Sequence, residues 1–129
     1  MSNFYRSRIF VFGKWWKTVE HVYQATKTSD PEEQEQIRNA KTPREARNLG
    51  QVCMYRQDFD QIKFSIMKKC VLEKYVQHHD LREQLLATGD EELIEDSPVD
   101  YYWGCGKDGS GKNMLGKALM KIREELKAD

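Results

Sequence analysis

The chain has 129 residues, of which 33% are charged, and 21 Lys and Arg balance 21 Asp and Glu for a formal net charge of zero. This length predicts one domain, residues 1–129, with a real hydrophobic core. The zero balance excludes a uniform attraction to nucleic acid or membrane but leaves room for a local basic patch. No apolar run approaches the roughly 20 residues of a membrane span, and the first residues lack the apolar region of a signal peptide.

The cysteines and histidines favour a reduced protein without a metal. Three cysteines without CxxC spacing are most simply interpreted as reduced thiols in the cytoplasm. His78 and His79 are adjacent, so on a helix or strand they cannot share one ligand face. We therefore expect a cytoplasmic protein with no metal site and no cofactor.

The N-terminal elements are a hairpin and a helix. Residues 7–17 are rich in β-forming side chains and predict a β-hairpin with its tight turn at Gly13-Lys14. Thr18 then stands as a good N-cap for a helix over residues 19–28.

The rest of the chain is mostly helical. Two helices begin with an N-cap followed by proline, at Asp30-Pro31 and at Thr42-Pro43, the second with a full capping box. Gly50 ends the second of these helices, and a later helix ends near Thr88-Gly89. The predicted segments are helices over residues 30–40, 42–50, 58–77, 80–88 and 114–127, and a short strand over 92–95. The fold class is therefore α+β and mainly α-helical: a compact single domain with an N-terminal β-hairpin and about five to six helices.

A glycine-rich stretch precedes the last helix and nearly forms a P-loop. Gly106-x4-Gly111-Lys112 fits that pattern, but Asn113 stands where Ser or Thr should hold magnesium. No buried strand precedes the stretch and too few residues follow for a sheet, which excludes a P-loop NTPase. A turn remains, with Asn113 as N-cap of the last helix, able to cradle a phosphate or a ribose.

One face of the helix over residues 19–28 carries Glu20, Gln24 and Lys27. Glu20 lies in the first turn, where the helix dipole favours the ionised form that suits a nucleophile or base. The alternative is an ordinary first-turn acid that stabilises its own helix. Lys27 has two interpretations as well, a ligand for phosphate or carboxylate and a solvated surface lysine.

A carboxylate stands beside three aromatic residues in Asp100-Tyr101-Tyr102-Trp103. Such aromatics can stack on a purine or pyrimidine. They can equally anchor the loop to the core, and the sequence leaves both interpretations open.

Six motifs together resemble the YbiA-like or NADAR domain family over nearly the whole chain. They are Ser2-Asn3-Phe4-Tyr5, Gly13-Lys14-x-Trp16-x-Thr18-x-Glu20-His21-x-Tyr23-Gln24-Ala25-x-Lys27, Thr42-Pro43-x-x-Ala46-x-x-Leu49-Gly50, Arg56-x-Asp58-Phe59-Asp60-x-Ile62-Lys63, Leu85-Leu86-Ala87-Thr88-Gly89 and Asp100-x-x-Trp103-Gly104-x-Gly106-x-Asp108-Gly109-x-Gly111-x-Asn113-x-Leu115-Gly116. The chain departs from the family at Lys17, where a proline is common, and at Phe59, where relatives often carry Trp.

The resemblance implies an enzyme that hydrolyses N-glycosidic bonds. Two substrate classes are implied: phosphorylated ribosylamino-pyrimidine intermediates of riboflavin biosynthesis, and ADP-ribosylated guanine in DNA or RNA. It implies catalytic roles for Glu20 and Asp100. The substrate pocket that we expect from it consists of Asn3, Phe4, Tyr23, Lys27, Phe59, Trp103, Gly104, Gly111 and Asn113. The alternative function is a non-catalytic module that binds ADP-ribose or a related nucleotide.

Overall fold

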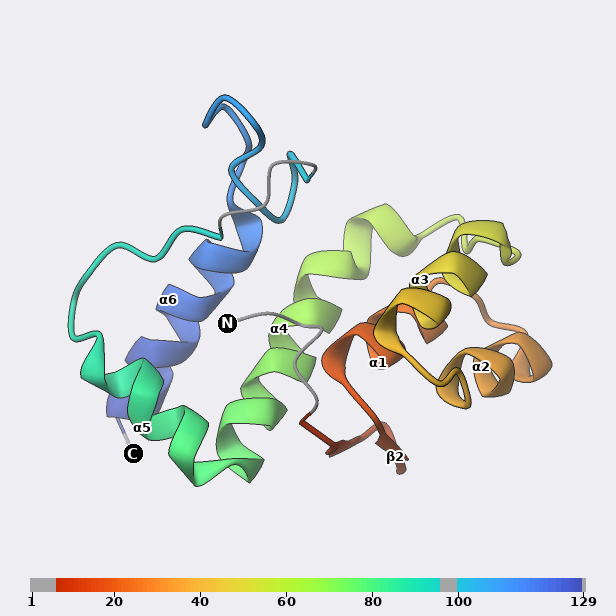
Figure 1. Cartoon of the computed structure of the whole chain (residues 1–129), viewed down its shortest axis with the longest axis horizontal. Coiled ribbons are helices and arrows are strands. Elements are labelled where there is room, and N and C mark those ends of the chain that lie inside the picture. The colour runs from red at the N-terminus through yellow and green to blue at the C-terminus, as the bar shows by residue number, and fades with distance from the viewer. Residues whose placement is uncertain (1–6, 96–99, 129) are drawn as a thin grey trace. The chain divides into compact units, whose positions relative to one another are not determined.

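A computed structural model describes residues 7–95 and 100–128 of the chain. Within these ranges it has one two-stranded sheet and six helices (Figure 1), which confirms the predicted mainly helical α+β fold. The elements are β1 (Ile9–Val11), β2 (Lys14–Trp16), α1 (Val19–Ala25), α2 (Pro31–Arg38), α3 (Pro43–Val52), α4 (Phe59–Gln77), α5 (His79–Ala87) and α6 (Met114–Lys127). None of these described helices is long and apolar enough to cross a membrane.

The chain divides into two compact units, Met1–Gln77 and His78–Asp129. The first contains the hairpin and α1 to α4, and the second contains α5 and α6. A single domain over the whole chain stays a prediction.

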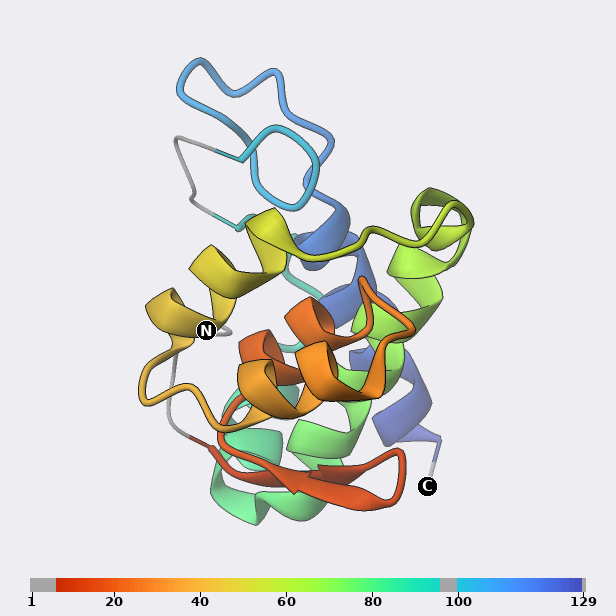
Figure 2. The ribbon, with the colours of Figure 1, turned by 90° about the vertical axis from the view of Figure 1, so that its right-hand side faces the viewer.

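The hairpin turns one residue earlier than predicted. β1 and β2 pair antiparallel (Figure 2) with Val11 opposite Lys14, so the two-residue loop is Phe12-Gly13. Both loop residues have positive φ, 53° and 77°, as a tight hairpin of this length prefers. The predicted turn at Gly13-Lys14 was wrong because glycine takes the second loop position and Phe12 accepts the left-handed conformation at the first.

α1 is the centre of the first unit and contacts α2, α3 and α4 (Figure 1). All seven of its residues are buried. Thr18 caps it as predicted, since its hydroxyl oxygen accepts a hydrogen bond from the His21 backbone N–H at 3.2 Å. The His21 ring is fixed as well: Nδ1 lies 2.7 Å from the Thr18 hydroxyl and Nε2 lies 3.0 Å from the Ala40 carbonyl. Because a carbonyl only accepts, Nε2 donates and Nδ1 accepts, so His21 is a structural group.

α3 continues beyond the glycine that was predicted to end it. Gly50 lies inside the helix, which ends at Val52. A side chain at Gly50 would overlap the amide of Gln24 on α1. Gly50 therefore allows α1 and α3 to approach each other closely and does not terminate the helix.

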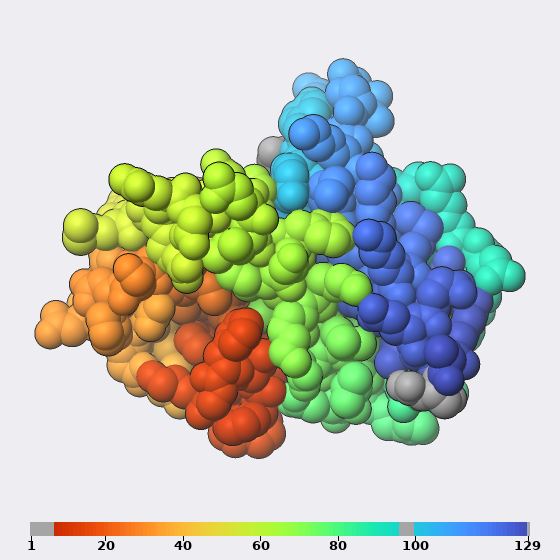
Figure 3. All heavy atoms as spheres, turned by 180° about the vertical axis from the view of Figure 1, so that it is seen from behind, coloured from red at the N-terminus to blue at the C-terminus, as the bar shows by residue number. Residues whose placement is uncertain are grey.

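The Gln77 side chain of α4 binds the outer edge of the hairpin. Gln77 Oε1 accepts a hydrogen bond from the Phe10 N–H, and Gln77 Nε2 donates to the Phe10 carbonyl, both at 2.8 Å. These bonds occupy the outer edge of β1, which would otherwise present unpaired backbone groups. The hairpin (red) accordingly lies at the surface beside α4 (green) in Figure 3.

In the second unit, the segment before the glycine-rich loop is held by Asn113 and is not a strand. Asn113 Nδ2 donates to the Leu93 carbonyl at 2.9 Å, and its Oδ1 accepts from the Glu95 N–H at 2.8 Å. The predicted strand over residues 92–95 was therefore wrong. Asn113 precedes α6 with a left-handed φ of 51°, and its side chain makes no cap hydrogen bond, so its predicted role as N-cap was wrong in mechanism although right in position.

Candidate active site

A carboxylate and an amide form a buried pair on α1. Glu20 is only 8% exposed and Gln24 only 3%. Gln24 Nε2 donates a hydrogen bond of 2.6 Å to Glu20 Oε1. Their spacing of four residues places both side chains on one helix face, as the sequence predicted. The amide thus fixes the orientation of a carboxylate that is largely removed from water.

Gly50 controls the position of that amide. Gln24 Oε1 is buried and has no hydrogen-bond partner among the described residues. The Gln24 side chain lies where a side chain at Gly50 would be. The α3 backbone at Gly50 therefore fixes the position of the Gln24 side chain, and Gln24 in turn orients the Glu20 carboxylate.

Lys27 brings a positive charge to the same region. Burial lowers its pKa, the Glu20 carboxylate acts in the opposite direction, and the like charges of Arg47 and Lys63 lower it further. The ammonium also lies 5.6 Å from the centre of the Tyr23 ring, a distance typical of a cation–π contact. Lys27, which follows α1, is therefore close enough to Glu20, to Arg47 on α3 and to Lys63 on α4 for their charges to affect it.

Aromatic rings next to Lys27 form a packed group. Phe59 meets Tyr23 edge to face at 5.3 Å and Tyr55 at 5.4 Å between ring centroids. Phe59 is 1% exposed and Tyr23 is 7% exposed, whereas Tyr55 is 51% exposed. Tyr55 is thus the accessible ring of this group, although only Tyr23 and Phe59 were expected at the substrate. Contact of those two with substrate stays a prediction.

The glycine-rich loop uses its backbone donors internally. The N–H groups of residues 111 to 115 donate to carbonyls of residues 101 to 105, at distances from 2.6 to 3.0 Å. The pairs are Gly111 to Cys105, Lys112 to Tyr101, Asn113 to Gly104, Met114 to Tyr102 and Leu115 to Trp103. The N–H groups of Gly111 and Asn113 therefore already have partners within the loop, and a contact of these two residues with substrate phosphate stays a prediction.

Asp100 and the aromatic residues belong to the same internal arrangement. Asp100 Oδ1 accepts from the N–H groups of Tyr102 and Trp103, at 2.9 and 2.7 Å. The rings of Tyr102 and Trp103 meet edge to face at 4.7 Å. Tyr101 lies against Gly106, where an added side chain would overlap its ring. This geometry favours the loop-anchoring interpretation for Tyr101, and a substrate contact of Trp103 or Gly104 stays a prediction.

A comparison with known families decides what the chain is. The sequence profile of the NADAR domain matches residues 1–127. The chain belongs to the NADAR domain family. A solution NMR structure of the Escherichia coli protein YbiA has the same fold, with a TM-score of 0.92 at 40% sequence identity, covering 98% of this chain and 77% of that one.

Curated relatives of this NADAR chain carry two kinds of name. It is 47% identical to "N-glycosidase Npun_R5314" of Nostoc punctiforme, over 98% of this chain and 84% of the relative. It is 41% identical to "N-glycosidase YbiA" of Escherichia coli, over 97% and 79%. It is 43% identical to "Riboflavin biosynthesis protein VVA0006" of Vibrio vulnificus, over 98% of this chain but 35% of that longer protein.

The NADAR motifs predict some residues of this candidate site and leave others out. Asn3 and Phe4 lie outside the described residues. Within the described ranges, no three His, Cys, Asp or Glu side chains gather as a metal site. Gln24 was recognised on the face of Glu20 but was not counted as a site residue. Arg47 and Lys63 were missed, because only their proximity to Lys27 in space reveals them.

Proposed function

We propose that this NADAR protein is an N-glycosidase that cleaves a ribose C1′–N bond, with Glu20 as its catalytic carboxylate. The observation that carries the proposal is the buried Glu20 carboxylate, oriented by the 2.6 Å hydrogen bond from Gln24. The names of the Nostoc and Escherichia relatives support the activity.

The chemistry requires a fixed negative charge near the sugar. As the C1′–N bond breaks, positive charge develops on the ribose ring, and a preorganised carboxylate stabilises it. Glu20 either takes a proton from the water that attacks C1′ or attacks C1′ itself to form an ester that water then hydrolyses. In both cases water adds to C1′ and the base leaves with a proton.

The cations beside Glu20 suit a phosphorylated substrate. We assign Lys27 to bind a phosphate group of the substrate, supported by the charges of Arg47 and Lys63 that act on it. Both implied substrates carry phosphate: an ADP-ribosylated guanine and a ribosylamino-pyrimidine phosphate. The riboflavin-related name of the Vibrio relative favours the second.

The test is a Glu20→Gln variant assayed on an ADP-ribosylated guanine oligonucleotide and on a ribosylamino-pyrimidine phosphate. We expect turnover to fall by about 10²-fold or more, because the variant loses the charge but keeps a similar shape. Glu32→Gln is the matched control, since Glu32 is also a first-turn glutamate but is exposed on α2. Thermal unfolding checks that both variants are folded.

Two outcomes would contradict the proposal. Full turnover by a folded Glu20→Gln variant would remove Glu20 from catalysis. Tight binding of ADP-ribose by the wild-type protein, with no turnover of either N-glycoside, would favour the non-catalytic binding module.

A further inference from the structure

The outward face of the hairpin is aromatic. Phe10 and Trp15 are opposite each other on β1 and β2, and their rings meet edge to face at 5.4 Å. They are 44% and 51% exposed, and Phe12 in the turn is 54% exposed. Side chains alternate along a strand, so the other face of the hairpin, with Ile9, is buried. Large apolar rings thus gather on a surface that the first unit leaves open.

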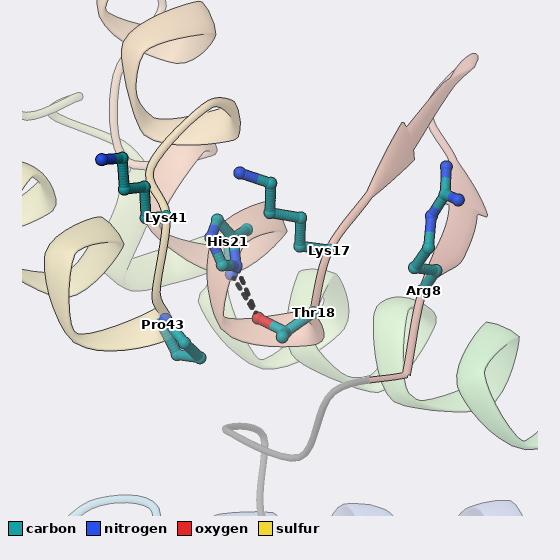
Figure 4. Close-up of a pocket in the computed structure, with 6 residues that line it drawn as sticks. All are labelled: Arg8, Lys17, Thr18, His21, Lys41 and Pro43. Atoms are coloured by element: carbon teal, nitrogen blue, oxygen red, sulfur yellow. Dashed lines mark hydrogen bonds between the residues drawn. The ribbon is translucent and has the colours of Figure 1, made fainter.

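Positive charge lies directly beside these rings. The Arg8 guanidinium is 5.3 Å from the centre of the Trp15 ring. Arg8 also lines a cavity of about 520 Å³, together with Lys17, Lys41 and Pro43. Figure 4 shows Lys17 and Lys41 extending on either side of His21, with Arg8 on the hairpin side. Arg8 therefore connects the aromatic face with a cationic cavity.

Two lysines of this cavity, Lys17 and Lys41, keep donor hydrogens for a ligand. His21 and Thr18 bond to each other and to the protein backbone. Lys17 Nζ donates to the carbonyls of Asn39 and Ala40, at 3.3 and 2.7 Å, which positions its ammonium and leaves its third hydrogen. Lys41 Nζ has no hydrogen-bond or ion-pair partner among the described residues.

The zero net charge of the chain conceals an asymmetry. Residues 1–77 contain 14 Lys and Arg against 9 Asp and Glu, whereas residues 78–129 contain 7 against 12. The hairpin and the cavity belong to the basic part. The acidic Glu35 near the hairpin is already paired with Lys14 at 3.1 Å and with Arg38 at 2.6 Å. Such a local excess of positive charge is typical of a surface that binds polyanions.

We propose that this surface binds a single-stranded nucleic-acid segment, with bases stacked on Phe10 and Trp15 and backbone phosphate held by Arg8, Lys17 and Lys41. Exposed aromatic rings interleaved with cations are the elements by which proteins bind single strands without reading sequence. The inference rests on the proposed function for its role: the strand is the one that carries the modified guanine. The binding itself is measurable without any catalysis.

The test measures binding of a fluorescent single-stranded oligonucleotide of about 12 nucleotides, within the usual footprint of such surfaces. We expect Phe10→Ala with Trp15→Ala to weaken binding about tenfold or more, since stacking is lost for each ring. Trp15→Phe alone should retain most of the affinity. Lys41→Ala should reduce the slope of log affinity against log salt by about 0.7, one phosphate contact on a single strand.

Controls separate this inference from the proposed function. Lys117→Ala removes an exposed lysine from α6 and should leave binding and salt slope unchanged. Glu20→Gln should bind the strand like the wild type even when it is inactive. The Phe10→Ala, Trp15→Ala variant should still hydrolyse a small N-glycoside that has no strand. Failure of catalysis in the wild type would leave this binding test intact.

Three results would overturn the inference. The first is equal strand affinity of the wild type and the Phe10→Ala, Trp15→Ala variant. The second is binding of AMP or inorganic phosphate in the cavity with no binding of the strand, which would assign the site to small phosphorylated molecules. The third is a wild-type dimer that Trp15→Ala dissociates, measured by light scattering, which would assign the aromatic face to self-association.

Discussion

The polar face of α1 and the glycine-rich loop use their polar atoms in opposite ways. On α1, Glu20 accepts a side-chain hydrogen bond from Gln24 and stands beside the charge of Lys27. In the loop, the carbonyls of residues 101 to 105 and the N–H groups of residues 111 to 115 satisfy one another. The sequence predicted ligand binding for both regions, because glycines before a helix and a row of polar residues on a helix are each typical of a binding site.

The difference indicates which of the two regions can support a reaction. A backbone donor that already has a carbonyl partner gains little from a phosphate, because the exchange replaces one hydrogen bond with another. A carboxylate that is already oriented can stabilise positive charge that develops on a substrate without further reorganisation. We therefore interpret the loop as a rigid support for its aromatic side chains and assign the catalytic carboxylate to α1.

The largest effect should follow from Gly111→Ala. A side chain there would overlap the Gly104 carbonyl and the backbone of Cys105, and backbone atoms cannot move aside as a flexible side chain does. We expect the free energy of unfolding to fall by about 3 kcal/mol, measured by urea denaturation. Gly109→Ala is the control, because space around it is open and only its φ of 82° opposes a side chain. Equal losses in the two variants would show that the Gly111 contacts are not tight.

Gly50→Ala should affect activity more than stability. The new methyl group would displace the Gln24 amide, which is the flexible end of a side chain, and break its bond to Glu20. Alanine also favours the helix by about 1 kcal/mol over glycine, which offsets the lost packing. We expect kcat to fall about tenfold with little change in KM or in the unfolding midpoint.

Asn48→Ala is the matched control for Gly50→Ala. Asn48 is exposed on α3, so the change adds helix propensity without touching Gln24. It should leave kcat unchanged. Unchanged kcat in Gly50→Ala as well would mean that Gln24 does not position Glu20.

The sequence predicted what depends on neighbouring residues and missed what depends on distant ones. The N-caps Thr18, Asp30 and Thr42 were correct, because a cap bonds within its own first turn. Gly50 was misread as a helix end because its reason is a side chain on another helix. Asn113 was misread as a cap because its side-chain partners lie 18 and 20 residues earlier.

A pair of variants at Asp100 separates its structural role from a catalytic one. Both loop N–H groups bond to Oδ1, and an asparagine oxygen can accept the same bonds without the charge. We expect Asp100→Asn to keep near wild-type stability, and Asp100→Ala to lose about 1 kcal/mol for the unmade hydrogen bonds. If Asp100 acts only on the loop, Asp100→Asn should also keep most of the activity. Loss of turnover in a stable Asp100→Asn variant would instead place the Asp100 charge in catalysis.

The smallest effects concern two lysines whose pKa values move in opposite directions. Burial lowers the pKa of Lys27 from its ordinary value of 10.5, whereas a hydrogen bond to Asp90 raises the pKa of Lys127. Between the lowered value and 10.5 the unfolded chain binds more proton at Lys27, so this residue makes stability rise with pH. For Lys127 the native state holds the proton more tightly, so its contribution is present below 10.5 and is lost as pH rises through the higher native value.

Urea denaturation between neutral pH and about pH 11 tests these signs, since the range covers the ordinary lysine pKa. The stability of the wild type relative to Lys27→Met should rise as the pH approaches 10.5, because charging Lys27 costs least where the group is neutral in both states. The stability relative to Lys127→Met should fall toward the upper end of the range. If the two stability differences change in the same direction with pH, the Lys27 ammonium is as well solvated as a surface lysine. The assignment of Lys27 as a preformed phosphate ligand beside Glu20 would then lose its electrostatic support.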